Sequence, residues 1–168
     1  MIDIAKIEAA RGRIASTVHR TRTELSDRLS TAAGVPVYLK LEHHQRTGSF
    51  KIRGATNAIL NLTDDQRAKG VVGVSTGNHG RGLAYAARQN GVRCIVAMSK
   101  LVPQNKIDGI RAQGAEVRIV GQSQDDAQVE VDRLVEEEGM TMIPPLITPT
   151  LLQGRARLAW NSSKMCPT

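Results

Sequence analysis

The stretch that decides the fold is VVGVSTGNHGRGLAYAARQNGVRCIVAM, residues 71–98. An apolar run, 71–75, leads through a polar loop to an Ala- and Leu-rich segment with helical spacing, 79–90. Gly91 follows this segment, and glycine is the usual residue just past a helix end. A second apolar run, 93–98, completes a strand–helix–strand unit, which places two parallel strands side by side through a right-handed crossover.

The same alternation of strand and helix patterns extends in both directions from this unit. Its other predicted members are helices over 4–15 and 51–62, a strand over 37–41, a helix from Pro103 to Gly114, a strand over 116–120, a helix from Ser123 to about Glu138 and a short strand over 140–143. We therefore predict an α/β fold, with an open parallel sheet and helices on both faces. Ligands of such sheets bind at the carboxyl ends of the strands. The loops there are 43–50, 75–79, 99–103 and 120–123.

The composition excludes several classes of partner. The chain has 168 residues and a net charge of +7, but no basic run with the interleaved aromatics that stack on bases, so we expect no nucleic-acid partner. No apolar run approaches the roughly 20 residues of a membrane span. The first residues lack the apolar core of a signal peptide. Cys94 and Cys166 show no metal-ligand or redox spacing. We expect a cytoplasmic protein without a metal and without a membrane contact.

Lys51 is the first candidate functional residue, because it opens a predicted helix directly after a polar loop. The positive end of the helix dipole, together with burial, disfavours the protonated amine. An unprotonated amine is what a Schiff-base lysine requires. The plainer interpretation is a surface lysine on the first helical turn.

The loop Ser75-Thr76-Gly77-Asn78-His79-Gly80 is the second candidate, because it joins a buried strand to a helix. Its backbone N–H groups and hydroxyls would suit a carboxylate. The alternative is a tight turn in which Asn78 or Ser75 caps the helix. The order of glycines differs from the G-x-G-x-x-G dinucleotide fingerprint, so a nicotinamide-binding domain is not expected.

Three segments together carry a family resemblance: LKLEHHQRTGSFKIRGA, STGNHGRGLAYAA and VPQNKIDGIRAQGAEV. They resemble the serine/threonine dehydratases of the fold-type II pyridoxal 5′-phosphate (PLP) enzymes, which share a tryptophan-synthase-β-like fold. LEHHQ and SQDDA are most similar to the hydroxyectoine-utilisation dehydratase branch. The resemblance covers roughly residues 15 to 145.

The resemblance implies a role for each matching position. Lys51 would carry PLP and move the Cα proton, Phe50 would pack beside the pyridine ring, and Asn78 would hydrogen-bond the 3′-oxygen of the ring. The residues around the substrate carboxylate would be Ser75, Thr76, Gly77 and His79. The implied reaction is β-elimination of a hydroxy amino acid, such as threonine or serine, to a 2-oxo acid and ammonia. Full-length relatives are expected to be homo-oligomers.

The chain departs from this family pattern towards its end. No two of its glycines are adjacent, so the G-G-G-G-L phosphate loop of the family does not occur. In the family, a segment such as FDHPDIIAGQGTLGLE follows the two prolines. One coding sequence for that segment, read after deletion of a single T from its first codon, gives LITPTLLQGRARLAW, which is the sequence from Leu146 to Trp160. We therefore expect residues 146–168 to be an out-of-frame tail, with a naturally divergent tail as the competing account.

These observations predict the domain organisation and leave alternative functions open. Residues 1–50 would belong to the large PLP domain and residues 51–145 would form a small α/β domain. The leading function is a PLP-dependent dehydratase, impaired by truncation. The alternatives are an inactive gene fragment, a non-enzymatic α/β domain and, within the family, an amino-acid racemase.

Overall fold

A computed structural model describes residues 3–145 of the chain, so the tail hypothesis for 146–168 concerns residues outside the described part. The helices are α1 (Ile4–Ile14), α2 (Asp27–Ala33), α3 (Lys51–Leu60), α4 (Asp64–Lys69), α5 (Asn78–Gln89), α6 (Gln104–Arg111) and α7 (Gln124–Glu138), with a 3-10 turn at Glu42–His44. The strands are β1 (Thr23–Leu25), β2 (Tyr38–Lys40), β3 (Val71–Val74), β4 (Cys94–Met98), β5 (Glu116–Ile119) and β6 (Thr141–Met142).

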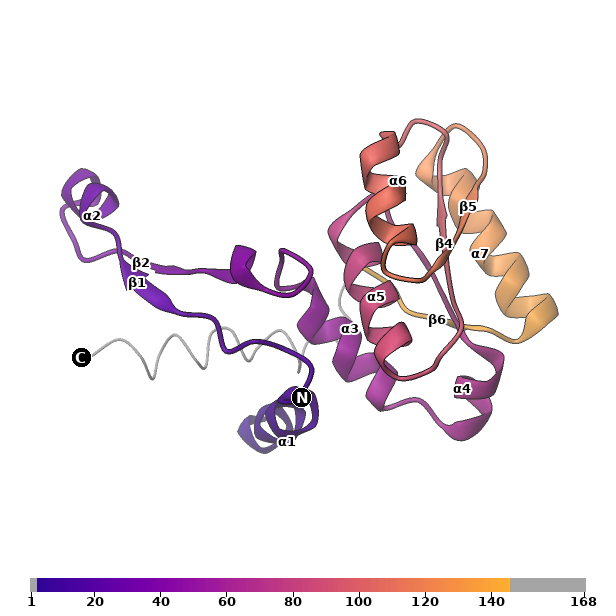
Figure 1. Cartoon of the computed structure of the whole chain (residues 1–168), viewed down its shortest axis with the longest axis horizontal. Coiled ribbons are helices and arrows are strands. Elements are labelled where there is room, and N and C mark those ends of the chain that lie inside the picture. The colour runs from indigo at the N-terminus through magenta and orange to yellow at the C-terminus, as the bar shows by residue number, and fades with distance from the viewer. Residues whose placement is uncertain (1–2, 146–168) are drawn as a thin grey trace.

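The main sheet has the strand order β5-β4-β3-β6, and every neighbouring pair is parallel. Val71 of β3 lies opposite Cys94 on one side and Thr141 on the other. The chain moves outward from β3 through β4 to β5 and then returns to the opposite side of β3 (Figure 1). This reversal creates a switch point between β3 and β6, where ligands of doubly wound sheets bind.

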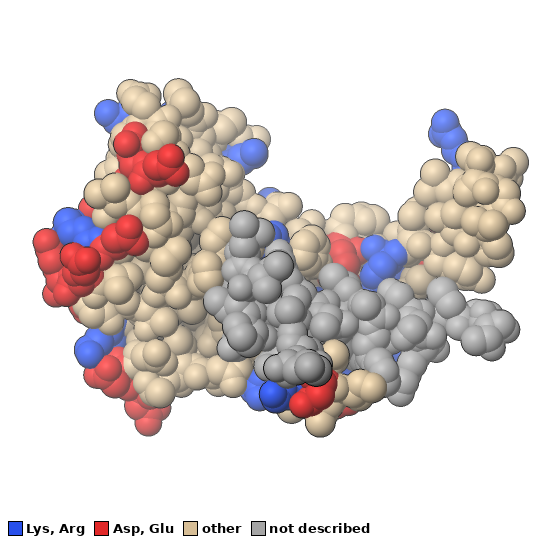
Figure 2. Space-filling model, turned by 180° about the vertical axis from the view of Figure 1, so that it is seen from behind, with Lys and Arg blue, Asp and Glu red and all other residues tan. Residues whose placement is uncertain are grey.

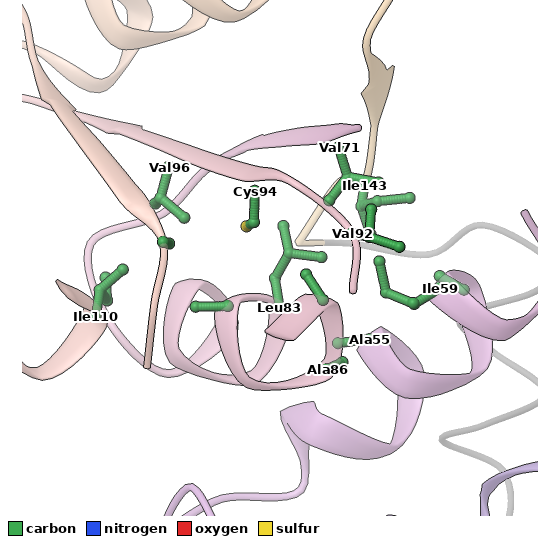
Figure 3. Close-up of a cluster of buried hydrophobic side chains, with 14 of the residues drawn as sticks. Ala55, Ile59, Val71, Leu83, Ala86, Val92, Cys94, Val96, Ile110 and Ile143 are labelled. Atoms are coloured by element: carbon green, nitrogen blue, oxygen red, sulfur yellow. The ribbon is translucent and has the colours of Figure 1, made fainter. Parts of the chain in front are cut away.

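Helices cover both faces of this sheet, as predicted. On one face, α3, α5 and α6 form a core around Leu83, Val96 and Ile110 (Figures 1 and 3). On the other face, α7 packs Val131 and Leu134 against β3 and β4. Strands β3 and β4 are buried along their whole length, which explains their continuous apolar sequence.

An arm formed by β1, α2 and β2 projects from this α/β body (Figure 1). The two strands pair antiparallel, and the sequence predicted only the second of them. Ser26 caps α2 at its start, and Gly34 ends it with a φ of 69°. The arm carries large exposed apolar side chains at Leu25, Leu29, Val35, Tyr38 and Leu39.

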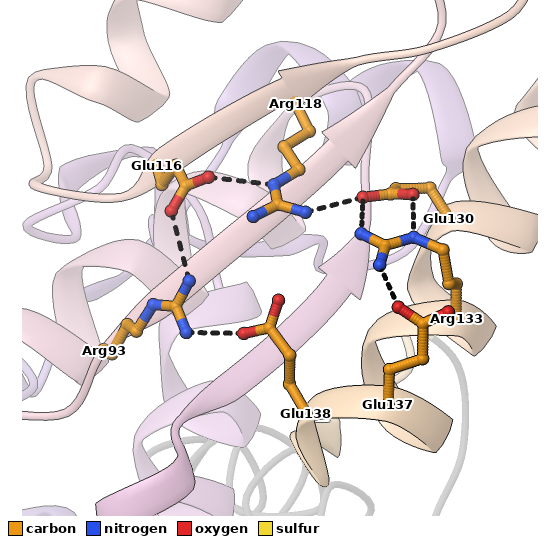
Figure 4. Close-up of polar contacts among 7 residues, drawn as sticks. All are labelled: Arg93, Glu116, Arg118, Glu130, Arg133, Glu137 and Glu138. Carbon is orange, nitrogen blue, oxygen red and sulfur yellow. Dashed lines mark hydrogen bonds and ion pairs between the residues drawn. The ribbon is translucent and has the colours of Figure 1, made fainter.

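A network of ion pairs joins β5, the edge strand, to β4 and α7 (Figure 4). Its members are Arg93, Glu116, Arg118, Glu130, Arg133, Glu137 and Glu138. Hydrogen bonds from Arg133 and Arg118 lower the pKa of Glu130 to about 2. The acidic side chains of this region gather on the side of the body farthest from the arm (Figure 2).

The structure describes the surroundings of Cys94 and allows a search for membrane-spanning helices and metal-ligand clusters. Cys94 lies in the core, and burial raises the pKa of its thiol to about 12, so it is a buried apolar residue. Among residues 3–145, no helix is long and apolar enough to cross a membrane. The same range contains no cluster of three metal-ligating His, Cys, Asp or Glu residues.

Candidate active site

The loop that leads into Lys51 is anchored by buried polar contacts. Arg53, which is 2% exposed, donates from Nη2 to Glu42 Oε1 at 2.7 Å and from Nε to Glu42 Oε2 at 2.9 Å. Gln45 Nε2 donates to the carbonyl of His19 at 2.6 Å. The Arg53–Glu42 bonds join the two ends of the 42–53 segment to each other, and the Gln45 bond ties the segment to the chain just before β1.

Close contact between α3 and α5 places Lys51 beside the second predicted loop. A Cβ atom on Gly82 would lie 3.0 Å from the amide nitrogen of Ile52 and 3.2 Å from the carbonyl carbon of Lys51. Only a glycine allows the α5 backbone to come this near to the first turn of α3. The approach joins the starts of both helices at one edge of the sheet.

Ser75 shapes the turn at the start of α5. Its Oγ accepts the N–H of Gly80 at 2.8 Å and that of Gly77 at 3.2 Å. The N-cap residue of α5 is Gly77, so neither Ser75 nor Asn78 occupies the cap position, and Ser75 bonds the turn from two residues before it. Since a hydroxyl also carries one hydrogen, Ser75 retains a donor for a ligand.

His79 is buried beneath the same turn. Its Nε2 lies 2.9 Å from the carbonyl oxygen of Ile143, just after β6. The imidazole therefore joins α5 to the strand on the other side of the switch point. The sequence could place His79 in the loop but could not show this contact of its side chain.

A cavity of about 520 Å³ lies at the switch point. Its lining residues are Lys51, Val74, Ser75, Thr76, Gly77, Asn78, His79, Arg81, Asn105, Lys106, Gln124 and Pro145. Lys51 Nζ donates to the carbonyl of Pro145 at 3.1 Å and lies 5.7 Å from the ring centroid of Phe50. All the predicted lysine, loop and carboxylate-binding residues thus meet at one cavity, with Phe50 beside the amine.

Sequence reasoning missed four polar or charged lining residues, Arg81, Asn105, Lys106 and Gln124, and also Val74 and Pro145. Asn105, Lys106 and Gln124 lie just after two loops, 99–103 and 120–123, that the sequence did place at this edge. Arg81 lies one helical turn after Asn78. The sequence signal that could have identified these four residues is their position in the first turn of a helix after a strand–helix loop, because that turn also lies at this edge of the sheet.

The electrostatics of the cavity favour anions. Four helices begin beside it, namely α3, α5, α6 and α7. Helix starts attract negative charge through their N–H groups and dipoles. Lys51, Arg81 and Lys106 contribute cationic side chains, and no described lining residue is acidic.

The residues present fit PLP at the end that reacts. A lysine amine faces the cavity, an aromatic ring lies beside it, and a Cβ on Gly77 would meet nothing within 4 Å, which leaves room for a ligand against the backbone. PLP carries an anionic phosphate, which suits the positive potential of this cavity. The glycine-rich phosphate loop of the family remains absent from the sequence of 168 residues.

Fold and site define a class: an α/β protein with a lysine amine in an anion-attracting cavity at the switch point of a parallel sheet. The particular family follows from sequence comparison. The sequence model of the pyridoxal-phosphate dependent enzymes matches residues 14–162, so the chain belongs to this family.

Individual relatives agree with that assignment. A Sinorhizobium fredii protein named for threonine dehydratase activity is 57% identical over 154 residues, which is 92% of this chain and 46% of the relative. The L-threonine ammonia-lyase of Thermotoga maritima is 37% identical, over 94% of this chain and 39% of the relative. The crystal structure of serine racemase from Dictyostelium discoideum superposes with a TM-score of 0.92 at 30% identity, covering 99% of this chain and 54% of that one. The chain spans about half the length of the relatives it matches.

Proposed function

We propose that the chain contributes to PLP-dependent β-elimination, in which a hydroxy amino acid such as threonine or serine gives a 2-oxo acid and ammonia. The observation that carries this proposal is the position of Lys51 at the start of α3, in one cavity with the Ser75–His79 loop. The names of the Sinorhizobium and Thermotoga relatives support the same reaction class.

The residues of the cavity have distinct tasks under this proposal. Lys51 holds the cofactor and transfers the Cα proton, while Phe50 packs beside the ring and Asn78 bonds its 3′-oxygen. Ser75, Thr76, Gly77 and His79 surround the substrate carboxylate, with Ser75 donating its remaining hydrogen. Bound PLP supplies the electron sink that lets Cα lose its proton.

Cofactor attachment provides the first test. The purified chain is incubated with PLP, reduced with borohydride and digested, and the modified peptide is identified by mass spectrometry. We expect the modification on Lys51 and its loss in Lys51→Ala, whereas Lys69→Ala, an exposed lysine of α4, should retain it. Absence of modification at Lys51 would overturn the proposal.

Product analysis provides the second test and separates the alternative within the family. The likeness to a serine racemase of known structure favours a racemase as runner-up. With L-threonine or L-serine, a dehydratase releases a 2-oxo acid and ammonia, whereas a racemase yields the D-amino acid. Chiral chromatography together with a 2-oxo acid assay distinguishes the two.

The proposal also includes the organisation of the protein. Residues 1–50 belong to the large PLP domain and 51–145 form the small domain. We also propose that full-length relatives form homo-oligomers, that this protein acts in the cytoplasm, and that it belongs to the hydroxyectoine-utilisation branch. Modification of Lys51 without turnover would support an inactive fragment, and failure of both tests would favour a non-enzymatic α/β domain.

A further inference from the structure

Arg81 and Lys106 occupy the side of the cavity formed by α5 and α6, apart from the residues discussed so far. Within residues 3–145, no ion pair joins either side chain to a carboxylate. Other arginines of the body have partners, such as Arg88, which donates to the carbonyl of Ala112. The cavity therefore contains two cationic groups that the described fold does not use.

The position of Arg81 points to a ligand. Its Nε is buried and has no hydrogen-bond partner among the described residues. Its side chain lies against Gly109 of α6, where a Cβ atom would come within 3.4 Å of that Nε. Buried donors in folded proteins normally have partners, so an unsatisfied guanidinium on a side chain that lines the cavity is consistent with a role in binding an anion.

We propose that Arg81 and Lys106 form a subsite for a second anionic group, a carboxylate or phosphate, on the side chain of the amino-acid substrate. This inference rests on the proposed function and narrows its substrate class to amino acids whose side chain carries an anionic group, which serine and threonine lack. The start of α5 and the Ser75 hydroxyl receive the α-carboxylate, and the α6 side of the cavity receives the second anion. A guanidinium matches a carboxylate or phosphate with two parallel hydrogen bonds, and Lys106 adds a point charge. Asn105 of α6 and Gln124 of α7 also line the cavity.

The volume of the cavity is compatible with this assignment. At about 520 Å³, it falls within the usual range for sites that enclose a small ligand. The positive ends of the helix dipoles strengthen the preference for a second anionic group, because one carboxylate neutralises only part of their combined field.

Matched amino acids measure the subsite directly. Calorimetric titration of the full chain without added PLP compares O-phospho-L-serine with L-serine, and L-aspartate with L-2-aminobutyrate. Each pair shares its α-amino and α-carboxylate groups, so the difference reports the second group alone. We expect the anionic member to bind about tenfold more tightly, as charge-assisted hydrogen bonds imply, with a smaller ratio at high salt. The two pairs show whether phosphate or carboxylate is preferred.

Variants assign that preference to residues. The double variant Arg81→Gln/Lys106→Gln should bind the anionic and the neutral amino acid of each pair almost equally, so that the ratio of the two affinities falls to near one. Arg81→Lys should keep part of that ratio. Arg88→Gln on α5 and Arg111→Gln on α6 are controls, because both side chains lie outside the cavity, and they should keep the full ratio. Circular dichroism confirms that each variant is folded, and Arg81→Lys remains informative if the double variant is not.

Three results would overturn the inference: equal binding within both pairs, an unchanged ratio in the double variant, or loss of the ratio in the controls. A fourth is a double variant that loses its preference for PLP over pyridoxal, since the pair would then bind the cofactor phosphate. PLP attachment to Lys51 is measured in parallel. If PLP attaches to Lys51 but the anionic amino acids bind no more tightly, only this inference is wrong. If they bind more tightly but PLP does not attach, the proposed function is wrong and the cavity is an anion site.

Discussion

Replacing Gly82 with alanine tests the helix contact that positions Lys51. The added methyl carbon would lie 3.0 Å from the amide nitrogen of Ile52 and 3.2 Å from the carbonyl carbon of Lys51. Both atoms belong to the backbone, so no side-chain rotation can relieve the contact. The start of α3 must therefore move away from α5.

Two opposing effects set the magnitude. Overpacking of a well-packed contact costs about 1–3 kcal/mol. Replacing glycine by alanine inside a helix contributes about 1 kcal/mol in the opposite direction. The expected net loss in the free energy of unfolding is about 1 kcal/mol, which lowers Tm by about 2–4 °C for a chain of this size. Since Lys51 moves with the first turn of α3, borohydride trapping of PLP should also decrease.

Gly12→Ala is the matched control. Gly12 lies in α1, and a Cβ there would meet nothing within 4 Å, so only helix propensity acts and stability should rise by up to about 1 kcal/mol. Urea unfolding followed by far-UV circular dichroism measures both variants. If Gly82→Ala is stabilised as much as Gly12→Ala and takes up PLP like the parent chain, the Gly82 contact does not position Lys51.

Four further predictions concern other parts of the structure. Glu42→Ala should lower the free energy of unfolding by about 3–5 kcal/mol in urea titrations, because it leaves the buried guanidinium of Arg53 without its carboxylate partner and with only the His19 carbonyl; a loss below 1 kcal/mol would contradict this. The ion pairs hold the pKa of Glu130 at about 2, below its ordinary 4.5, so their stabilisation is present above pH 4.5 and is lost as the pH falls towards 2. Glu130→Gln should flatten that part of the stability–pH curve, and an unchanged slope would refute the assignment. Cys94, whose pKa is raised to about 12, should react with a thiol reagent only after unfolding, and rapid modification of the folded chain, mapped by mass spectrometry, would argue otherwise. The exposed apolar arm should cause self-association and poor solubility, which Leu25→Lys reduces in sedimentation experiments; a monomeric parent chain of ordinary stability would oppose this.

The sequence predicted the α/β body closely because its elements have strong signals. Strands buried on both faces appear as uninterrupted apolar runs, and the ends of α7 are marked by Ser123 and Gly139, both of which cap it in the structure. Predicted boundaries differ by one to three residues, as for α3, which ends at Leu60 instead of 62.

The elements that the sequence missed lack such signals. Helix α2 has no buried residue, so its sequence has no apolar stripe. Helix α4 has six residues, too few for a helical period, although Thr63 and Gln66 form a capping box that could have revealed it. Strand β1 has three residues and pairs only with β2.

The candidate site was predicted only in part, for a topological reason. Lys51 and the Ser75–His79 loop could be identified from their own sequence. The contribution of Arg81 and Lys106 depends on the packing of α5 beside α6, which no local pattern states. Likewise, the contact between His79 and Ile143 depends on β6 lying next to β3.

The convergence of four helix starts at the cavity has an evolutionary consequence. The attraction for anions that comes from these helix ends resides in the backbone, so it persists in any descendant that keeps the fold, whatever its side chains. Substitutions at positions such as Arg81 can then alter which anion is chosen without removing the capacity to capture one. The choice of anion can therefore change with the side chains of the cavity, while the attraction for anions persists with the topology.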